Sequence, residues 1–231
     1  MNKKTEIKKS YQEYKNTNNS TNILDDLKVG DILFSNSDTF TSNRIRKITN
    51  SKYSHVAIYL GDGKITHSTR KGVSTESLDS LINESSYIAI TRQLDEWSLR
   101  RKKVLKIFAE EMQNTKYNYN FMSFFKAKYN EIKHEKNITK KLDTYFETPF
   151  KTREIPESVF CSQYILECLY KVGLIDDSFV VAYDPCTISP KDMIDYIPVG
   201  FHVGYIKHEN ISIDEDDDFC NKGKYYELVS K

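Results

Sequence analysis

Five short runs of apolar, β-branched and aromatic residues predict β-strands, because such side chains suit a pleated and half-buried surface. The runs are 32–34, SHVAIYL at 54–60, KITHS at 64–68, YIAITR at 87–92 and GFHVGYI at 200–206. Only Gly61, Asp62 and Gly63 separate the second run from the third, which is a strong signal for a tight hairpin. We therefore expect these two runs to pair as antiparallel neighbours.

Three further segments carry helical signals. Residues 161–172 repeat apolar residues at helical spacing and end before Gly173, a typical residue just after a helix. Ser189 is a suitable N-cap before Pro190, with Asp192 at the third helical position. Residues 97–113 carry an apolar stripe of Trp97, Val104, Ile107, Phe108 and Met112.

The chain divides into an N-terminal arm and one domain. Residues 1–22 are rich in Lys, Asn, Ser and Thr and predict a disordered arm. Residues 23–231 are expected to form a single domain that carries a lysine-rich insertion near 126–148. The acidic run 214–218 predicts a solvated loop.

Bulk composition excludes several classes of protein. The 231 residues carry a formal net charge of +1, which argues against a nucleic-acid binder that works by bulk attraction. No apolar run approaches the roughly 18 residues of a transmembrane helix. The N-terminus lacks the apolar core of a secretory signal, so the cytoplasm is the default expectation, and a leaderless export route would leave no trace. The four cysteines do not form the pattern of a disulfide framework.

Cys161 and His55 are the candidates for chemistry. A thiol needs a base or a helix N-terminus to become a nucleophile at neutral pH, and Cys161 follows Pro156 and the candidate cap Ser158 at a predicted helix start. The alternative for Cys161 alone is a small buried core residue, which is the interpretation preferred for Cys168.

His67 makes the catalytic hypothesis stronger, because a catalytic imidazole needs a polar group that orients it. Whether the connection between the two strands has an even or an odd number of residues decides whether His67 can do so. A plain two-residue turn would place His55 and His67 on opposite faces of the sheet. A three-residue loop, or an equivalent bulge, places Ala57 opposite His67 and makes the two histidines diagonal neighbours on one face. The catalytic hypothesis therefore predicts the loop or the bulge.

Two rival chemistries fit less well. The sequence contains neither a CxxC pair nor a histidine pair at helical spacing, so it does not have the usual ligand pattern of a zinc site. The segment from Gly61 to Lys64 is not a phosphate loop, because it lacks the GxxxxGK[ST] spacing and joins two strands.

The same residues lie in blocks that resemble a known family. SHVAIYLGDGKITHS resembles the histidine block of the circularly permuted NlpC/P60 (papain-like) cysteine hydrolases, and VFCSQYILECLYKVG resembles their cysteine block. LKVGDILFS, KYNYNF and TISPKDM are similar to landmarks of the YiiX/YebB-like members. The histidine block is also similar to that of lecithin:retinol acyltransferase (LRAT)-like enzymes.

The resemblance implies the α+β class, with a permuted papain-like fold in which an antiparallel sheet packs against the helix of the nucleophile. It implies that Cys161 is the nucleophile, that His55 is the base and that His67 orients His55, with no cofactor and no metal. The implied activity is that of a cysteine hydrolase or acyltransferase that acts on an amide or ester carbonyl through a thioester.

The substrate stays open between a peptide amide, including a cell-wall peptide, and a lipid acyl group. The Tyr- and Phe-rich stretch 117–125 and the basic insertion would suit a peripheral membrane contact, with ordinary core packing as the alternative. A second class of function is a binding module that keeps the fold while the thiol stays idle.

Overall fold

The computed structural model describes part of the chain. The described residues are 23–37, 40–114, 159–182, 185, 187–197, 199–207 and 211–220. The predicted arm at 1–22, the aromatic stretch 117–125 and the insertion near 126–148 lie outside them. The division into an arm and one domain with an insertion therefore stays a prediction.

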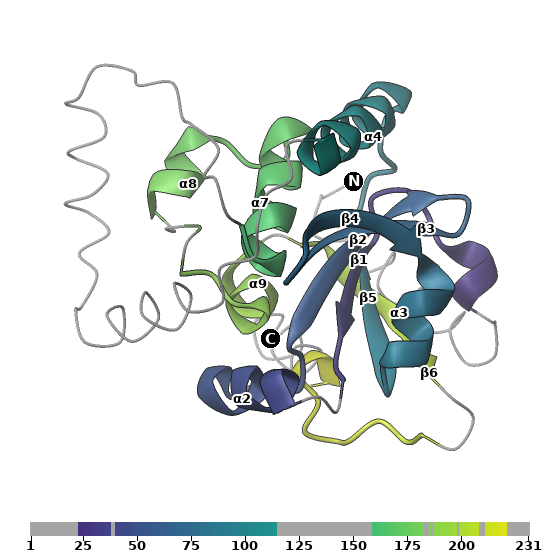
Figure 1. The fold of residues 1–231 in the computed structure, drawn as a ribbon, viewed down its shortest axis with the longest axis vertical. Helices are drawn as coiled ribbons and strands as arrows, with labels where there is room; N and C mark the ends of the chain where they lie inside the picture. Colours follow the sequence, from purple (N-terminus) through teal and green to yellow (C-terminus); the bar gives the residue numbers. More distant parts are fainter. Residues whose placement is uncertain are drawn as a thin grey trace, which may run out of the picture.

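Within the described residues, six strands form one antiparallel sheet in the order β4-β3-β2-β1-β5-β6 (Figure 1). The strands are β1 (Ile32–Ser35), β2 (His55–Gly61), β3 (Lys64–Thr69), β4 (Gly72–Ser77), β5 (Tyr87–Arg92) and β6 (Phe201–Lys207). All five predicted strands are present. The sequence analysis missed β4, because GVSTES contains one large apolar residue and several hydroxyl groups.

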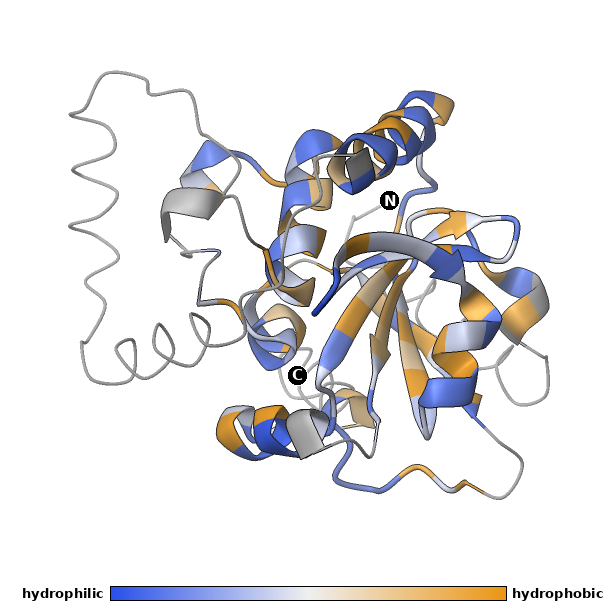
Figure 2. Ribbon diagram, viewed as in Figure 1, coloured by the Kyte–Doolittle hydropathy of each residue, from blue (hydrophilic) through white to orange (hydrophobic). Residues whose placement is uncertain are grey.

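Helices cover both faces of the sheet. They are η1 (Ile23–Asp26), α2 (Phe40–Thr49), α3 (Leu78–Glu84), α4 (Leu99–Asn114), α7 (Cys161–Lys171), α8 (Asp177–Ala182) and α9 (Pro190–Tyr196). In Figure 1, α4, α7 and α9 lie on one side of the sheet and α3 lies on the other. Two clusters of buried residues correspond to these faces, the larger one against α4 and α7 and the smaller one against α3. Figure 2 shows apolar residues along the central strands and mixed residues along α4.

The helix predictions are confirmed for α7 and α9 and partly wrong for α4. Ser189 caps α9 in a capping box with Asp192, as the sequence pattern predicts. In the predicted stripe of 97–113, however, Trp97 precedes the helix and Ile107 is 44% exposed, while Leu105 is fully buried. The other members of the stripe agree with the prediction, because Phe108 and Met112 are buried in the core and Val104 packs against it.

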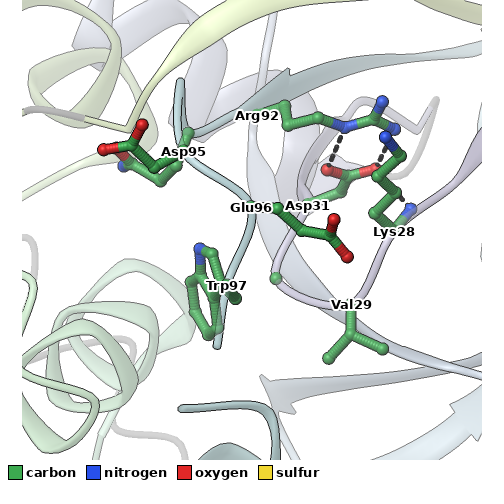
Figure 3. A pocket seen from close by; sticks show the side chains of 9 residues that line it. Lys28, Val29, Asp31, Arg92, Asp95, Glu96 and Trp97 are labelled. Carbon is green, nitrogen blue, oxygen red and sulfur yellow. Dashed lines mark hydrogen bonds and ion pairs between the residues drawn. The ribbon is translucent and has the colours of Figure 1, made fainter. Parts of the chain in front are cut away.

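The turn at Gly30 and Asp31 is held by close packing and by an ion pair. Gly30 has a φ of +100°, and a Cβ atom there would lie 2.5 Å from the ring of Trp97. The buried carboxylate of Asp31 accepts hydrogen bonds from Arg92 Nε at 2.8 Å and from Arg92 Nη2 at 2.7 Å. Figure 3 shows the guanidinium of Arg92 facing this carboxylate, with Trp97 nearby. The Gly-Asp pair thus fixes the entry to β1.

The acidic run 214–218 is only partly the solvated loop that the sequence predicts. Asp214 and Asp216 are exposed and pair with Lys52 at 3.1 and 3.0 Å. Asp217 is instead 0% exposed and lies among tyrosine hydroxyls. That part of the prediction is wrong, because a run of carboxylates does not reveal which of them meets buried donors.

Candidate active site

The hairpin of β2 and β3 has the bulge that the catalytic hypothesis predicts. Ile58 lies opposite Thr66 and Tyr59 opposite Ile65, but the next pair is Gly61 with Lys64. One extra residue therefore sits on β2 between Tyr59 and Gly61, followed by a turn in which Asp62 and Gly63 both have positive φ. Continuing the register past Ile58 and Thr66 sets Ala57 against His67, which puts both histidines on one face.

The two imidazoles are in direct contact. His55 Nε2 lies 3.0 Å from His67 Nδ1, with the rings nearly perpendicular at 73°. Burial, and next the neighbouring His67, lowers the pKa of His55 to about 3. The side chain of His67 is 6% exposed, and its burial lowers its pKa as well, against the opposing effect of Glu76. Both rings are therefore neutral near pH 7, and one of them donates to the other.

Glu76 is a third member of this cluster that the sequence analysis missed. Its Oε1 lies 3.4 Å from His67 Nε2, which is within ion-pair range although the angle is not that of a hydrogen bond. Ser74 Oγ donates to the same Oε1 at 2.9 Å. Ser74 lies opposite His67, so Glu76 is a diagonal neighbour of His67 on the adjacent strand. The available signal was weak, since β4 itself was not recognised.

Cys161 is the first residue of α7, as predicted, but its cap differs from the prediction. The N-cap is Phe160, whose side chain offers no acceptor to the amides of the first turn, and Ser158 lies outside the described residues. The side chain of Cys161 is 3% exposed. A thiol at this position lies at the positive end of the helix dipole, which favours a thiolate.

Hydrogen bonds attach the start of α7 to β3. Ser68 Oγ donates to the carbonyl oxygen of Val159 at 2.5 Å, and Thr66 Oγ1 bonds the hydroxyl of Tyr164 at 2.9 Å. Because side chains alternate along a strand, His67 points to the other side of β3, where Glu76 lies. The structure thus joins His55, His67 and Glu76 directly, and it brings Cys161 to the same end of β3 through its helix.

Cys168 differs from Cys161 although both lie on α7. It is fully buried, and burial raises the pKa of its thiol far above the usual value. The sequence-based assignment of Cys168 to the core agrees with this position.

Neither a metal centre nor a membrane span is found in the part of the chain that the structure describes. There, no group of three or more His, Cys, Asp or Glu side chains could hold a metal ion. The helices of these residues are also too short or too polar to cross a bilayer.

Residues 26–130 match a family described as permuted papain-like amidase enzymes, YaeF/YiiX, C92 family. This confirms the predicted family resemblance, and the mixed helices and antiparallel sheet agree with the predicted α+β class. The matched residues include His55, His67 and Glu76, and they end before Cys161.

The proteins that are similar to this chain include two from Escherichia coli. The probable lipoprotein peptidase YaeF of Escherichia coli strain K12 is 37% identical over 94 residues, which are 41% of this chain and 34% of that protein. The crystal structure of the metalloprotein YiiX from Escherichia coli O157:H7 is 25% identical, covers 42% of this chain and 54% of its own, and has a TM-score of 0.36. The chain therefore spans about a third of the one relative and about half of the other.

Proposed function

Residues 26–130 carry the match to the permuted papain-like amidases, and from this premise we propose that the protein is a cysteine amidase that acts through Cys161. The single observation that carries the proposal is the contact of His55 with His67 on the bulged hairpin. That contact supplies an oriented, neutral imidazole beside the strand to which the start of α7 is bonded. A neutral imidazole is the form that can accept a thiol proton.

The proposed reaction passes through a thioester. His55 Nδ1 takes the proton of Cys161 Sγ, and the thiolate attacks the amide carbonyl carbon. The backbone N–H of Cys161, at the start of α7, stabilises the oxyanion. His55 then gives its proton to the departing amine, and water attacks the thioester to release the acid and restore the thiol. His67 keeps the ring of His55 in place throughout. An approach of Sγ to His55 Nδ1 is part of this proposal.

A peptide amide is the substrate class that we favour over a lipid acyl group. The name of the YaeF relative describes a peptidase, and the matching family is described as amidases. A lipid ester or amide, and transfer to an acceptor other than water, would use the same thioester.

The first test compares cysteines within one protein. Iodoacetamide at pH 7, followed by site-resolved mass spectrometry, should label Cys161 far faster than Cys168 or the exposed Cys220. The substitution His55→Gln should remove this preference, and Cys168→Ser should leave it intact. Equally slow labelling of Cys161 and Cys168 would contradict the enzyme proposal and favour an idle binding module.

The second test identifies the acyl group. Incubation with a lysate, quenching in acid and weighing the peptide that contains Cys161 should reveal a peptidyl adduct, absent from Cys161→Ser. A fatty-acyl mass on Cys161 would overturn the peptide assignment and select a lipid substrate.

A further inference from the structure

Glu76 lies at the far end of a line of polar groups that runs across three neighbouring strands. His55 of β2 touches His67 of β3 at 3.0 Å, and His67 touches Glu76 of β4 at 3.4 Å. The side chain of Glu76 is 39% exposed, so its carboxylate keeps contact with solvent while one oxygen faces the buried ring. Ser74 Oγ bonds this same oxygen and fixes its direction.

The order of atoms along this line restricts the tautomers. The negative charge of Glu76, 3.4 Å from His67 Nε2, attracts an N–H and repels a bare nitrogen lone pair, so Glu76 favours a proton on His67 Nε2. A neutral His67 that is protonated at Nε2 has a bare Nδ1, which must accept from His55 Nε2–H. A neutral His55 that is protonated at Nε2 leaves its own Nδ1 bare. That nitrogen is the one that the proposed reaction needs as a base.

We propose that Glu76 is a positioning residue that sets the tautomers of His67 and His55, so that His55 Nδ1 is the unprotonated nitrogen available to Cys161. This inference rests on the proposed function for its catalytic meaning, but the tautomers can be measured without it. No proton moves to Glu76 in the reaction. The thiol proton goes to His55 Nδ1, and the carboxylate stabilises the imidazolium through His67.

The surrounding charges agree with this role. The hydrogen bond from Ser74 and the adjacent His67 and Lys71 lower the pKa of Glu76 despite the opposing effect of its partial burial, which keeps it ionised at neutral pH. Glu84 of α3 is the other carboxylate that acts on His67, from the exposed surface and through space. Protonation of His67 would place a hydrogen on its Nδ1 as well and would turn His55 to the wrong tautomer, so the line works only with a neutral His67.

Imidazole NMR tests the inference directly. In the full-length protein, the ring nitrogen and carbon shifts of His67 should report the Nε2–H tautomer at pH 7.5. In Glu76→Gln the amide can donate as well as accept, so the shifts should move toward a mixture of tautomers. Glu84→Gln is the matched control, because it removes a carboxylate that acts on His67 only through space, and it should leave the tautomer as in the unaltered protein.

The pH dependence of alkylation at Cys161 tests the catalytic meaning. Loss of the carboxylate should raise the pH at which the alkylation rate is half-maximal by about one unit. The rate on the acidic side should therefore fall about tenfold, while the rate on the alkaline plateau should stay unchanged. Glu76→Asp should restore part of the shift. In a His67→Gln background, Glu76→Gln should have no further effect, because Glu76 acts through His67.

The outcomes separate the two proposals. An unchanged His67 tautomer and an unchanged midpoint in Glu76→Gln, with Cys161 still selectively labelled, would overturn the role of Glu76 and leave the amidase proposal standing. Slow labelling of Cys161 in the unaltered protein would overturn the amidase proposal, while the NMR comparison would still decide the tautomer. A lower alkaline plateau with no shift of the midpoint would indicate a merely structural role for Glu76.

Discussion

Asp217 is a single residue on which three aromatic side chains converge. Its Oδ2 accepts from Tyr53 at 2.8 Å and from Tyr87 at 3.3 Å, and its Oδ1 accepts from Tyr205 at 2.7 Å. Burial, followed by the charge of Asp217, raises the pKa of Tyr53 and Tyr87 above the ordinary value, so these hydroxyls remain donors. The C-terminal segment is thereby attached to the core near β2, β5 and β6.

We expect Asp217→Ala to destabilise the protein by about 3 kcal/mol or more, because several buried or half-buried hydroxyls lose their acceptor. Chemical denaturation measures this difference. Asp216→Ala is the control, since Asp216 is exposed and pairs only with Lys52 among its described contacts, and it should cost less than about 1 kcal/mol. Equal effects of the two substitutions would show that the tyrosine cluster does not support the fold.

At the scale of elements, the decisive feature is the attachment of α7 to β3. Ser68 and Thr66 reach the start of the helix on one side of β3, while His67 between them reaches Glu76 on the other side. Because side chains alternate along a strand, β3 can contact the helix that begins at Cys161 on one face and carry His67 on the other. The position of Cys161 then depends on bonds made by residues adjacent to His67.

We expect Ser68→Ala to slow the alkylation of Cys161 several-fold, because the carbonyl of Val159 loses its donor and the helix start can shift. The loss of stability should be about 1–3 kcal/mol. Thr69→Ala is the matched control, since Thr69 bonds Gly72 within the β3–β4 turn and not α7. Site-resolved mass spectrometry gives the rates, and identical rates in both variants would contradict this role of Ser68.

The whole molecule holds several histidines in the neutral state. Burial lowers the pKa of His55 to about 3 and of His202 to about 4, and it lowers the pKa of His67 as well. In the unfolded chain each of them titrates near 6.5. Protons therefore bind the unfolded chain more strongly than the folded protein below that pH.

The contribution of these histidines to the free energy of unfolding should be complete above about pH 6.5, and it should be lost as the pH drops toward about 5. Each neutral histidine contributes a slope of up to about 1.4 kcal/mol per pH unit. Urea denaturation at pH 7.5, 6 and 5 measures the slope. His202→Gln should reduce it by the share of one histidine, and a stability that is constant or rises on acidification would contradict the prediction.

Local patterns determined most of the strands, the start and end of α7 and the capping box of α9. They succeed because alternation, helical spacing and cap chemistry act between residues close in the chain. They failed for β4, whose short polar sequence pairs only because β3 lies beside it, and for Ile107 and Asp217, whose exposure depends on distant elements.

The candidate site was determined by the sequence in part. Cys161, His55 and His67 were predicted from their sequence blocks, and their catalytic roles stay a prediction. The parity of the Gly61–Gly63 connection predicted the bulge, because side chains alternate along a strand and the loop length therefore fixes which residues share a face. Only the tertiary structure decided that Glu76 meets His67 and that Ser68 holds the start of α7. Such contacts join residues of different elements, and their geometry comes from how the strands twist and pack rather than from any spacing along the chain.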